Sequence, residues 1–208
     1  MSRQAEGTTS LDAQVRELVA AGELRDAGNL FISRLSPELR PFLHRLLGDV
    51  ALAEEAHSAA CERLWQGLKS FRWECSLRSW SYIVARREAS RVRARRAQAN
   101  VQQTTLSAAE RIASPTGPQA TLSTTRRDVL EDLRASLCDE DRDLLVLRVE
   151  RGLAWKEIAA AFLDNDAPDE ESLGREAARL RQRYRSIREG VKSALAKRGA
   201  RRPEPETP

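Results

Sequence analysis

The chain lacks a long hydrophobic run. None of its 208 residues lie in an apolar stretch long enough to cross a bilayer, so we expect no membrane insertion. The amino terminus, MSRQAEGTTS, has no charged start followed by an apolar segment and no small-residue cleavage site. Because these are the marks of a secretory signal, we expect a cytoplasmic protein.

Cysteine and histidine are scarce, which argues against several kinds of site. Cys61, Cys75 and Cys138 are odd in number and have no CxxC spacing, contrary to a disulfide framework or a four-cysteine zinc site. His57 and Cys61 are four residues apart, a spacing that zinc can use, but no second pair of ligands follows. With only His44 and His57 as imidazole bases and no glycine-rich phosphate loop, we expect no enzyme, no metal and no cofactor.

What is present is helical periodicity over nearly the whole chain, with no convincing alternating pattern of a strand. A hydrophobic content of 41% and a charged content of 32% suffice for one or two small domains. The apolar spacing fades between 98 and 125, where Gln, Ser, Thr and Pro are typical of a flexible tether. We therefore predict an all-α fold with two small helical domains, 11–97 and 126–199, joined by that linker and flanked by disordered ends at 1–10 and 200–208.

The most informative segment is a predicted helix dense in arginine. The net charge is only +4, so the distribution of charge matters more than its total. The helix has one acidic residue, Glu88, against Arg78, Arg86, Arg87, Arg91, Arg93, Arg95 and Arg96. Aromatic residues lie just ahead of it or near its start: Phe71, Trp73, Trp80 and Tyr82. Such residues can stack an unpaired base while arginines hold its backbone, although a packed aromatic core beside a solvated basic face gives the same pattern.

The second half has the plan of a helix-turn-helix motif. Asp139 is a good amino-terminal cap for a helix that Gly152 closes. A short amphipathic helix from Trp155 to Phe162 is followed by an acidic connection and then by a longer basic helix. Arginine suits a helix that enters the major groove, because its planar fork can contact guanine or phosphate. Basic amphipathic helices also bind RNA, acidic partners or membrane surfaces, so this segment alone leaves those alternatives open.

In combination, these segments resemble the bacterial RNA polymerase sigma factors of the extracytoplasmic-function group. The first half carries fragments of the family pattern: Asp26, Ala27, Phe31, Pro37, Leu46-Leu47-Gly48-Asp49, Ala53-Glu54-Glu55, Arg63, Trp65, Leu68, Phe71-Arg72, Glu74, Ser76, Arg78, Trp80, Tyr82 and Ala85-Arg86. The second half carries others: Leu144 to Arg148, Gly152-Leu153, Trp155 and Glu157-Ile158-Ala159. The match runs over most of the chain, and the order of the fragments is more specific than any one of them.

The resemblance implies a transcription initiation subunit with a region 2 bundle and a region 4 helix-turn-helix domain. Its partners would be core RNA polymerase, promoter DNA as duplex and as opened non-template strand, and an anti-sigma factor. The implied core-binding residues are Asp49, Glu54, Glu55, Cys61 and Trp65. Those implied for the minus-ten element are Arg72, Trp73, Glu74, Ser76, Arg78, Trp80, Arg86, Arg87 and Arg91. Those implied for the minus-thirty-five element are Arg175, Arg179, Arg181, Gln182, Arg183 and Arg185.

The residues themselves support some of these roles. Glu54, Glu55 and Glu62 give one helix an acidic side for a basic partner, with Trp65 as a buried anchor. The hydroxyl of Ser76 can cap the arginine-rich helix.

The chain departs from the family pattern at several places. Trp73 stands where the family often has glycine, so it either alters which base is read or packs against Trp80. Ser58-Ala59 replaces a Gln-Glu pair and Cys61 replaces an aromatic residue, which predicts weaker affinity for the polymerase. The connection over 163–172 is longer than an ordinary helix-turn-helix turn.

The rival function is a stand-alone helix-turn-helix regulator that binds duplex DNA without polymerase. Such a protein needs neither the acidic helix nor a stacking platform, so Glu55→Arg or Trp73→Ala would leave its DNA binding unchanged. A helical adaptor that binds only a protein partner would show little salt-sensitive affinity for DNA.

Overall fold

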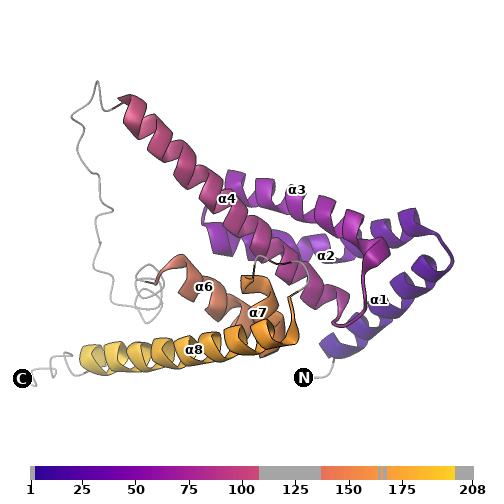
Figure 1. Cartoon of the computed structure of the whole chain (residues 1–208). Helices are drawn as coiled ribbons and strands as arrows, with labels where there is room; N and C mark the ends of the chain where they lie inside the picture. The colour runs from indigo at the N-terminus through magenta and orange to yellow at the C-terminus, as the bar shows by residue number, and fades with distance from the viewer. Residues whose placement is uncertain (1–2, 108–136, 164, 166–167, 200–208) are drawn as a thin grey trace, which may run out of the picture. The chain divides into compact units, whose positions relative to one another are not determined.

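The computed structural model describes residues 3–107, 137–163, 165 and 168–199, and all regular secondary structure in this part of the chain is helical (Figure 1). The all-α fold class predicted from the sequence is confirmed. The chain forms two compact units. None of the described helices is both long enough and apolar enough to cross a membrane.

The first unit contains α1 (Arg3–Ala20), α2 (Leu24–Leu47), α3 (Val50–Gly67), the short 3₁₀ helix η1 (Leu68–Ser70) and α4 (Leu77–Ser107). The second contains α6 (Asp139–Leu145), a π-helical turn η2 (Val146–Glu150), the start of α7 (Trp155–Phe162) and α8 (Glu170–Gly199).

Two helices extend into segments where the sequence suggests no structure. α1 begins at Arg3, within the stretch 1–10 predicted to be disordered. α4 continues through Ser107, into the predicted linker 98–125, because its last turns are rich in Ala and Gln and contain neither Gly nor Pro. The rest of that linker and the tail 200–208 lie outside the described residues.

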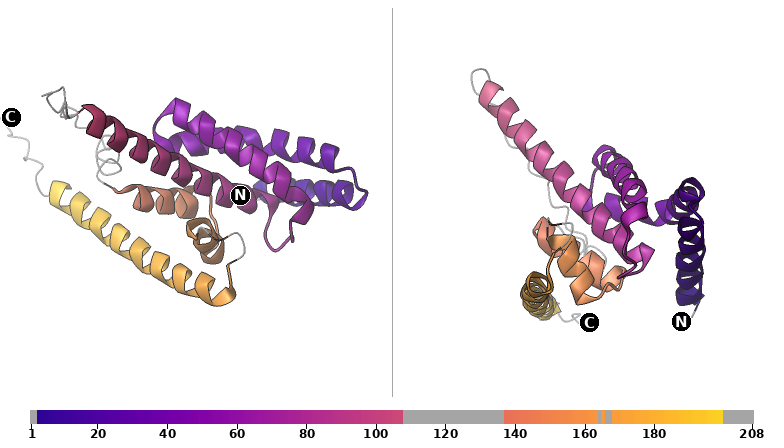
Figure 2. Two further views of the ribbon diagram at one scale, coloured as in Figure 1. Left: turned by 45° about the horizontal axis from the view of Figure 1, so that its top comes forward. Right: turned by 45° about the vertical axis from the view of Figure 1, so that its right-hand side comes forward.

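The core of the first unit lies between α2, α3 and α4, which run side by side (Figures 1 and 2). Phe42 of α2 is fully buried and meets the ring of Tyr82 edge-on, with ring centroids 4.9 Å apart. α2 ends at Gly48, whose φ of 68° favours glycine, and α3 begins where Asp49 accepts a 2.9 Å hydrogen bond from the Leu52 N–H. The short connection turns the chain back on itself, so that α3 packs along α2.

Gly28 is a point of close contact between two helices that the sequence pattern does not predict. It lies inside α2, and an added Cβ would come within 2.6 Å of the Trp65 ring of α3. Glycine normally weakens a helix, so its position here follows from the close approach of an indole ring.

We expect Gly28→Ala to destabilise the first unit by about 1–3 kcal/mol, because the new methyl group displaces Trp65. Urea unfolding with tryptophan fluorescence measures both effects. Gly190→Ala on α8 is the matched control, since an added Cβ there meets nothing within 4 Å. That variant should gain about 0.5–1 kcal/mol from helix propensity. Equal responses of the two variants would contradict the packing role of Gly28.

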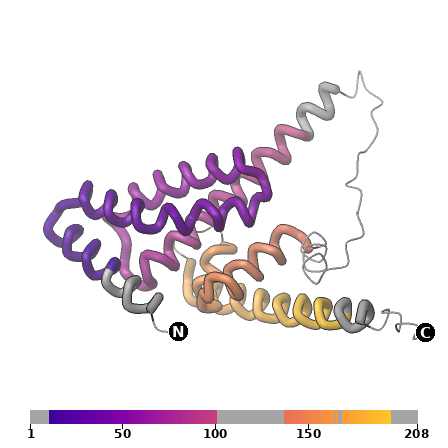
Figure 3. Tube along the Cα trace, turned by 180° about the vertical axis from the view of Figure 1, so that it is seen from behind, coloured from indigo at the N-terminus to yellow at the C-terminus, as the bar shows by residue number. Residues whose placement is uncertain are grey.

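The second unit is built around α8, with α6 packed against it (Figure 3). Leu144, Leu147, Ile158 and Leu180 are fully buried. Gly152 has a φ of 70° and follows η2, as its predicted role as the end of a helix requires.

Two predicted features of this unit need correction. Asp139 is not the cap of α6: Cys138 occupies that position, and Asp139 is the first helical residue, where it forms a 3.1 Å ion pair with Arg142. α8 begins at Glu170, so the connection is shorter than the predicted 163–172. The reason is Asp169, whose carboxylate accepts a 2.8 Å hydrogen bond from the Ser172 N–H and starts the helix earlier. The hydrogen bonds that Asp169 accepts from the N–H and the hydroxyl of Ser172 lower the pKa of its carboxyl group.

Candidate nucleic-acid interface

A chain of aromatic rings connects the core of the first unit to the loop between η1 and α4. Phe31, fully buried on α2, stacks on Trp80 with centroids 5.7 Å apart. Trp80 stacks on Phe71 at 4.5 Å, and Phe71 meets Trp73 edge-on at 5.0 Å. The four rings come from α2, α4 and the loop. Their contacts therefore attach the loop to the core of the first unit. Trp73 therefore packs against Phe71, and Trp80 reaches the loop through that ring.

Trp73 has an unusual backbone conformation. Its φ is 60°, the left-handed region that costs an L-residue with a side chain about 1–2 kcal/mol. It is the one non-glycine residue with positive φ among those the structure describes. A glycine at this position would adopt the same conformation without that cost. Such strained residues cluster at functional sites, where surrounding contacts hold them.

The ring of Trp73 forms one wall of a pocket between α1 and the loop. The pocket has a volume of about 500 Å³ and is lined by Asp12, Ala13, Arg16, Glu17, Ala20, Trp73 and Cys75. The guanidinium of Arg16 lies 5.1 Å from the centroid of the Trp73 ring. An aromatic face, a cation and carboxylates around one hollow can contact a planar base and its polar edge. Sequence reasoning missed the contribution of α1, because Arg16 and Trp73 are far apart in the chain.

The start of α4 is fixed by two hydrogen bonds. The Ser79 N–H donates to Ser76 Oγ at 3.0 Å, so the predicted capping role of Ser76 is confirmed. The Leu77 N–H donates to Asp12 Oδ1 at 3.3 Å. Burial raises the pKa of Asp12, and the hydrogen bond from Leu77 opposes that rise. The pocket wall from α1 is thereby tied to the helix that follows the loop.

The predicted minus-ten residues differ in their surroundings. Arg72 and Glu74 are exposed on the loop, with Arg72 Nη1 3.9 Å from Glu74 Oε1. Arg78 is held by a 2.8 Å contact to Glu38, which also accepts a 2.8 Å hydrogen bond from the Tyr82 hydroxyl. Burial opposes the charge of Arg78, but the hydrogen bond to Glu38 raises its pKa overall. This arginine is therefore part of the packing between α2 and α4.

Further along α4 the arginines are again partly structural. Arg86 and Arg87, both predicted to bind the minus-ten element, are buried. Arg91 pairs with Glu88, a buried carboxylate that also contacts Arg63 of α3 at 2.5 Å. The arginine-rich helix thus combines structural ion pairs with exposed charge.

The outer face of α3 carries three of the five predicted core-binding residues, Glu54, Glu55 and Trp65, whereas Asp49 is the cap of this helix and Cys61 is half-buried. Glu54 and Glu55 are exposed and pair with Arg40 at 3.6 Å and Arg95 at 2.9 Å. Exposed pairs of this kind contribute little to stability, so a partner can replace them at small cost. Trp65 is 41% exposed. Its ring is therefore not buried in the free chain, and its open part remains available for a contact.

His57 and Cys61 lie beneath this face as part of the packing. His57 is buried, with Nε2 2.8 Å from Ser36 Oγ and 3.5 Å from Cys61 Sγ. Among the described residues no group of three or more potential metal ligands comes together. Burial, followed by the charge of Arg40, lowers the pKa of His57, whereas Glu54 acts in the opposite direction. Burial raises the pKa of the Cys61 thiol.

The lowered pKa of His57 predicts a pH dependence of folding. Below about pH 6.5 the unfolded state binds a proton at this histidine more readily than the folded state does, so the unfolding free energy falls as pH decreases. Urea unfolding between pH 7 and pH 5 should show a steeper loss in the wild type than in His57→Gln. His44→Gln, at an exposed position, should behave like the wild type. Parallel pH profiles for the wild type and His57→Gln would contradict this role.

On α8 the six predicted duplex-binding residues divide into two sets. Arg179 and Arg183 point toward α6, where both contact Glu140, at 2.7 and 2.5 Å. Of the six, Arg175, Arg179, Arg181, Gln182 and Arg185 are exposed and Arg183 is half-buried; Arg175 also pairs with the exposed Glu171 at 2.9 Å. Trp155 of α7 lies between two guanidinium groups, with Arg148 at 4.8 Å and Arg181 at 5.6 Å from its ring centroid. Its ring also meets Tyr184 edge-on at 5.6 Å.

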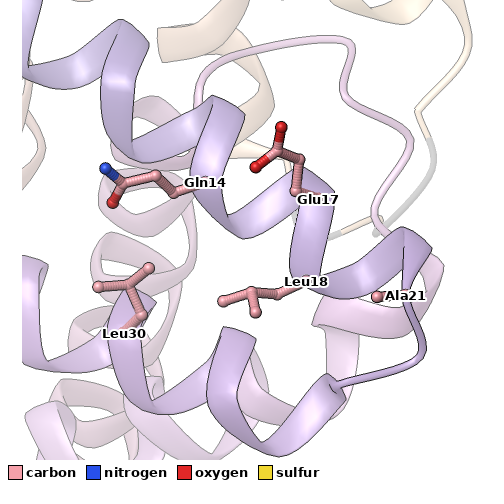
Figure 4. A pocket seen from close by; sticks show the side chains of 5 residues that line it. All are labelled: Gln14, Glu17, Leu18, Ala21 and Leu30. Atoms are coloured by element: carbon pink, nitrogen blue, oxygen red, sulfur yellow. The ribbon is translucent and has the colours of Figure 1, made fainter.

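A second hollow, of about 380 Å³, lies between α1 and α2 (Figure 4). It is lined by Gln14, Glu17, Leu18, Ala21 and Leu30. None of the predicted site residues lines it.

Comparison with known proteins gives similarities to a protein family and to solved structures. The family model described as Sigma-70 region 2 matches residues 31–99, from α2 into α4. Among solved structures, the sigma factor RpoE of Bartonella quintana, crystallised with the anti-sigma factor NepR, is similar with 17% sequence identity and a TM-score of 0.45. The similarity covers 76% of this chain and 94% of that one. A search of curated proteins found no match.

The family match contains the aromatic chain, the strained loop and the outer face of α3, which are all built from residues between Phe31 and Ala99. Every residue that the sequence resemblance assigns to polymerase or minus-ten binding lies within it. Residues 31–99 therefore match the sigma-70 region 2 family, and the resemblance to a sigma factor is confirmed over this segment.

Proposed function

We propose that the chain is a cytoplasmic sigma factor of the extracytoplasmic-function group, which binds core RNA polymerase and directs it to a subset of promoters. The observation that carries this proposal is the aromatic chain ending at the strained Trp73, within a segment that matches sigma-70 region 2. A regulator that binds only duplex DNA has no use for such a platform.

Strand opening would use the loop and the pocket beside it. A base of the non-template strand leaves the helix and stacks on the Trp73 ring, while Arg16 and Arg72 contribute positive charge near its phosphates. Extrusion costs a few kcal/mol, which stacking and hydrogen bonds in the pocket offset. No nucleotide hydrolysis is needed for this step.

The polymerase would bind along the outer face of α3. Glu54 and Glu55 exchange their weak surface pairs with Arg40 and Arg95 for basic groups of the partner, and the exposed part of Trp65 becomes buried. The second unit would place α8 in the major groove of the minus-thirty-five duplex. An anti-sigma factor that covers these faces is a further expected partner.

We expect Glu54→Arg with Glu55→Arg to weaken binding to core polymerase by about tenfold or more, because like charges then face each other. Fluorescence anisotropy of the labelled chain, titrated with core enzyme, measures the affinity. Glu74→Arg is the control for each substitution made singly, since it makes the same charge change as Glu54→Arg or Glu55→Arg at an exposed position outside α3. If the wild type fails to bind core polymerase, the proposed function is wrong, and the duplex-binding regulator becomes the better interpretation.

A further inference from the structure

The arginines of α8 are not equivalent, and their difference indicates which of them read DNA. Two of them, Arg179 and Arg183, lie one helical turn apart on the flank that faces α6. Arg181, Gln182 and Arg185 are exposed as well, and none of them forms an ion pair with the residues that the structure describes.

The flank facing α6 is occupied by a compact ion-pair network. Arg179 Nη2 lies 2.7 Å from Glu140 Oε1 and 2.7 Å from Glu176 Oε1. Arg183 contacts Glu140 at 2.5 Å and also pairs with Asp141, while its Nη2 lies 3.1 Å from Cys138 Sγ. The hydrogen bonds to these carboxylates raise the pKa of both arginines. Each guanidinium is thus shared between at least two acceptors.

Using these two arginines on DNA would be unfavourable. Their carboxylate partners are partly buried, with 33% of the Glu140 side chain and 19% of the Asp141 side chain exposed. Moving the guanidinium groups to phosphate would leave both carboxylates unpaired, beside a negatively charged duplex. With 46% of the Arg179 side chain and 32% of the Arg183 side chain exposed, these pairs are partly buried, and breaking them costs more than losing a fully exposed pair.

Arg181, Gln182 and Arg185 are exposed and lie outside this ion-pair network. Arg185 is exposed and makes no ion pair or hydrogen bond with the residues that the structure describes. The guanidinium of Arg181 lies over the Trp155 ring, 5.6 Å from its centroid, and the residue remains exposed. The side chain of Gln182 is exposed as well. Arginine pairs bidentately with guanine and glutamine with adenine, so this set has the side chains that direct base reading requires.

We infer that Arg179 and Arg183 are positioning residues, which fix α8 against Glu140 and Asp141 of α6. The residues that read the bases of duplex DNA are those outside the ion-pair network: Arg181, Gln182 and Arg185. This assignment rests on the proposed function and narrows the set implied by the sequence.

The test is selection of preferred sequences from a pool of random DNA duplexes by the full chain bound to core polymerase. Alanine variants of Arg181, Gln182 and Arg185 should each lose about tenfold of the discrimination at one or two base positions, with an unchanged melting temperature. Alanine variants of Arg179 and Arg183 should keep the base preference of the wild type and lower the melting temperature. An altered base preference in either Arg179→Ala or Arg183→Ala would overturn the inference.

A charge exchange keeps the test decisive if an alanine variant does not fold. In the double variant Asp141→Arg with Arg183→Glu the pair between these two positions is restored in reverse, although the pair with Glu140 is lost, so the melting temperature and the base preference should return part of the way toward wild-type values. Failure of the double variant to recover DNA binding, despite a recovered melting temperature, would overturn the positioning role. A wild-type chain that binds core polymerase but selects no duplex sequence would also overturn the inference, whereas failure to bind polymerase contradicts the proposed function itself.

Discussion

Trp73→Ala is expected to reduce promoter-dependent transcription by roughly one to two orders of magnitude. Stacking of a base on an aromatic side chain contributes about 1–3 kcal/mol, which corresponds to about 5- to 150-fold in an equilibrium. The reason is structural: the ring of Trp73 forms a wall of the pocket and is supported by Phe71 and Arg16. Run-off transcription and permanganate reactivity of unpaired thymines measure the loss of opened promoter.

Trp73→Gly is the matched variant, because it also removes the ring. Only glycine adopts a φ of 60° without steric cost, so this variant should be more stable than Trp73→Ala by about 1 kcal/mol. Both variants should bind core polymerase with wild-type affinity and fail to open the promoter. If either retains full opening, the stacking role of Trp73 is wrong. If both lose core binding, the ring serves the fold of the unit instead.

Phe31→Ala should destabilise the first unit by about 3–5 kcal/mol, since it removes a fully buried ring from the core. The Phe31 ring also stacks on Trp80, which in turn stacks on Phe71 of the loop. The substitution therefore removes the buried end of the aromatic chain. Urea unfolding followed by circular dichroism measures the loss. Val50→Ala, at a position that is 65% exposed, is the control and should change stability by less than about 0.5 kcal/mol. A loss below about 1 kcal/mol for Phe31→Ala would contradict its place in the core.

Much of this architecture follows from local features of the sequence. The helical period identifies an all-α chain, and a hydroxyl residue before an apolar run identifies the cap at Ser76. A glycine after a run of helical residues similarly marks the end of α2 at Gly48. These signals act over a few residues, so the linear pattern contains them.

The features that the sequence does not reveal depend on residues distant in the chain. Glu38 holds Arg78, and Arg16 of α1 lies over Trp73. No local pattern pairs these residues, since only the packing of α1, α2 and α4 brings them together. For the same reason, counting arginines on α8 does not separate Arg183, paired with α6, from the exposed Arg185.

The most direct measurement of the central proposal is transcription in vitro with purified core polymerase, with and without this chain, on a library of genomic promoter fragments. We expect new transcripts with defined start sites that appear only when the chain is added. These transcripts should share sequence elements near minus ten and minus thirty-five, and Trp73→Ala should lower their yield. The absence of any chain-dependent transcript, together with no binding to core polymerase, would contradict the assignment as a sigma factor.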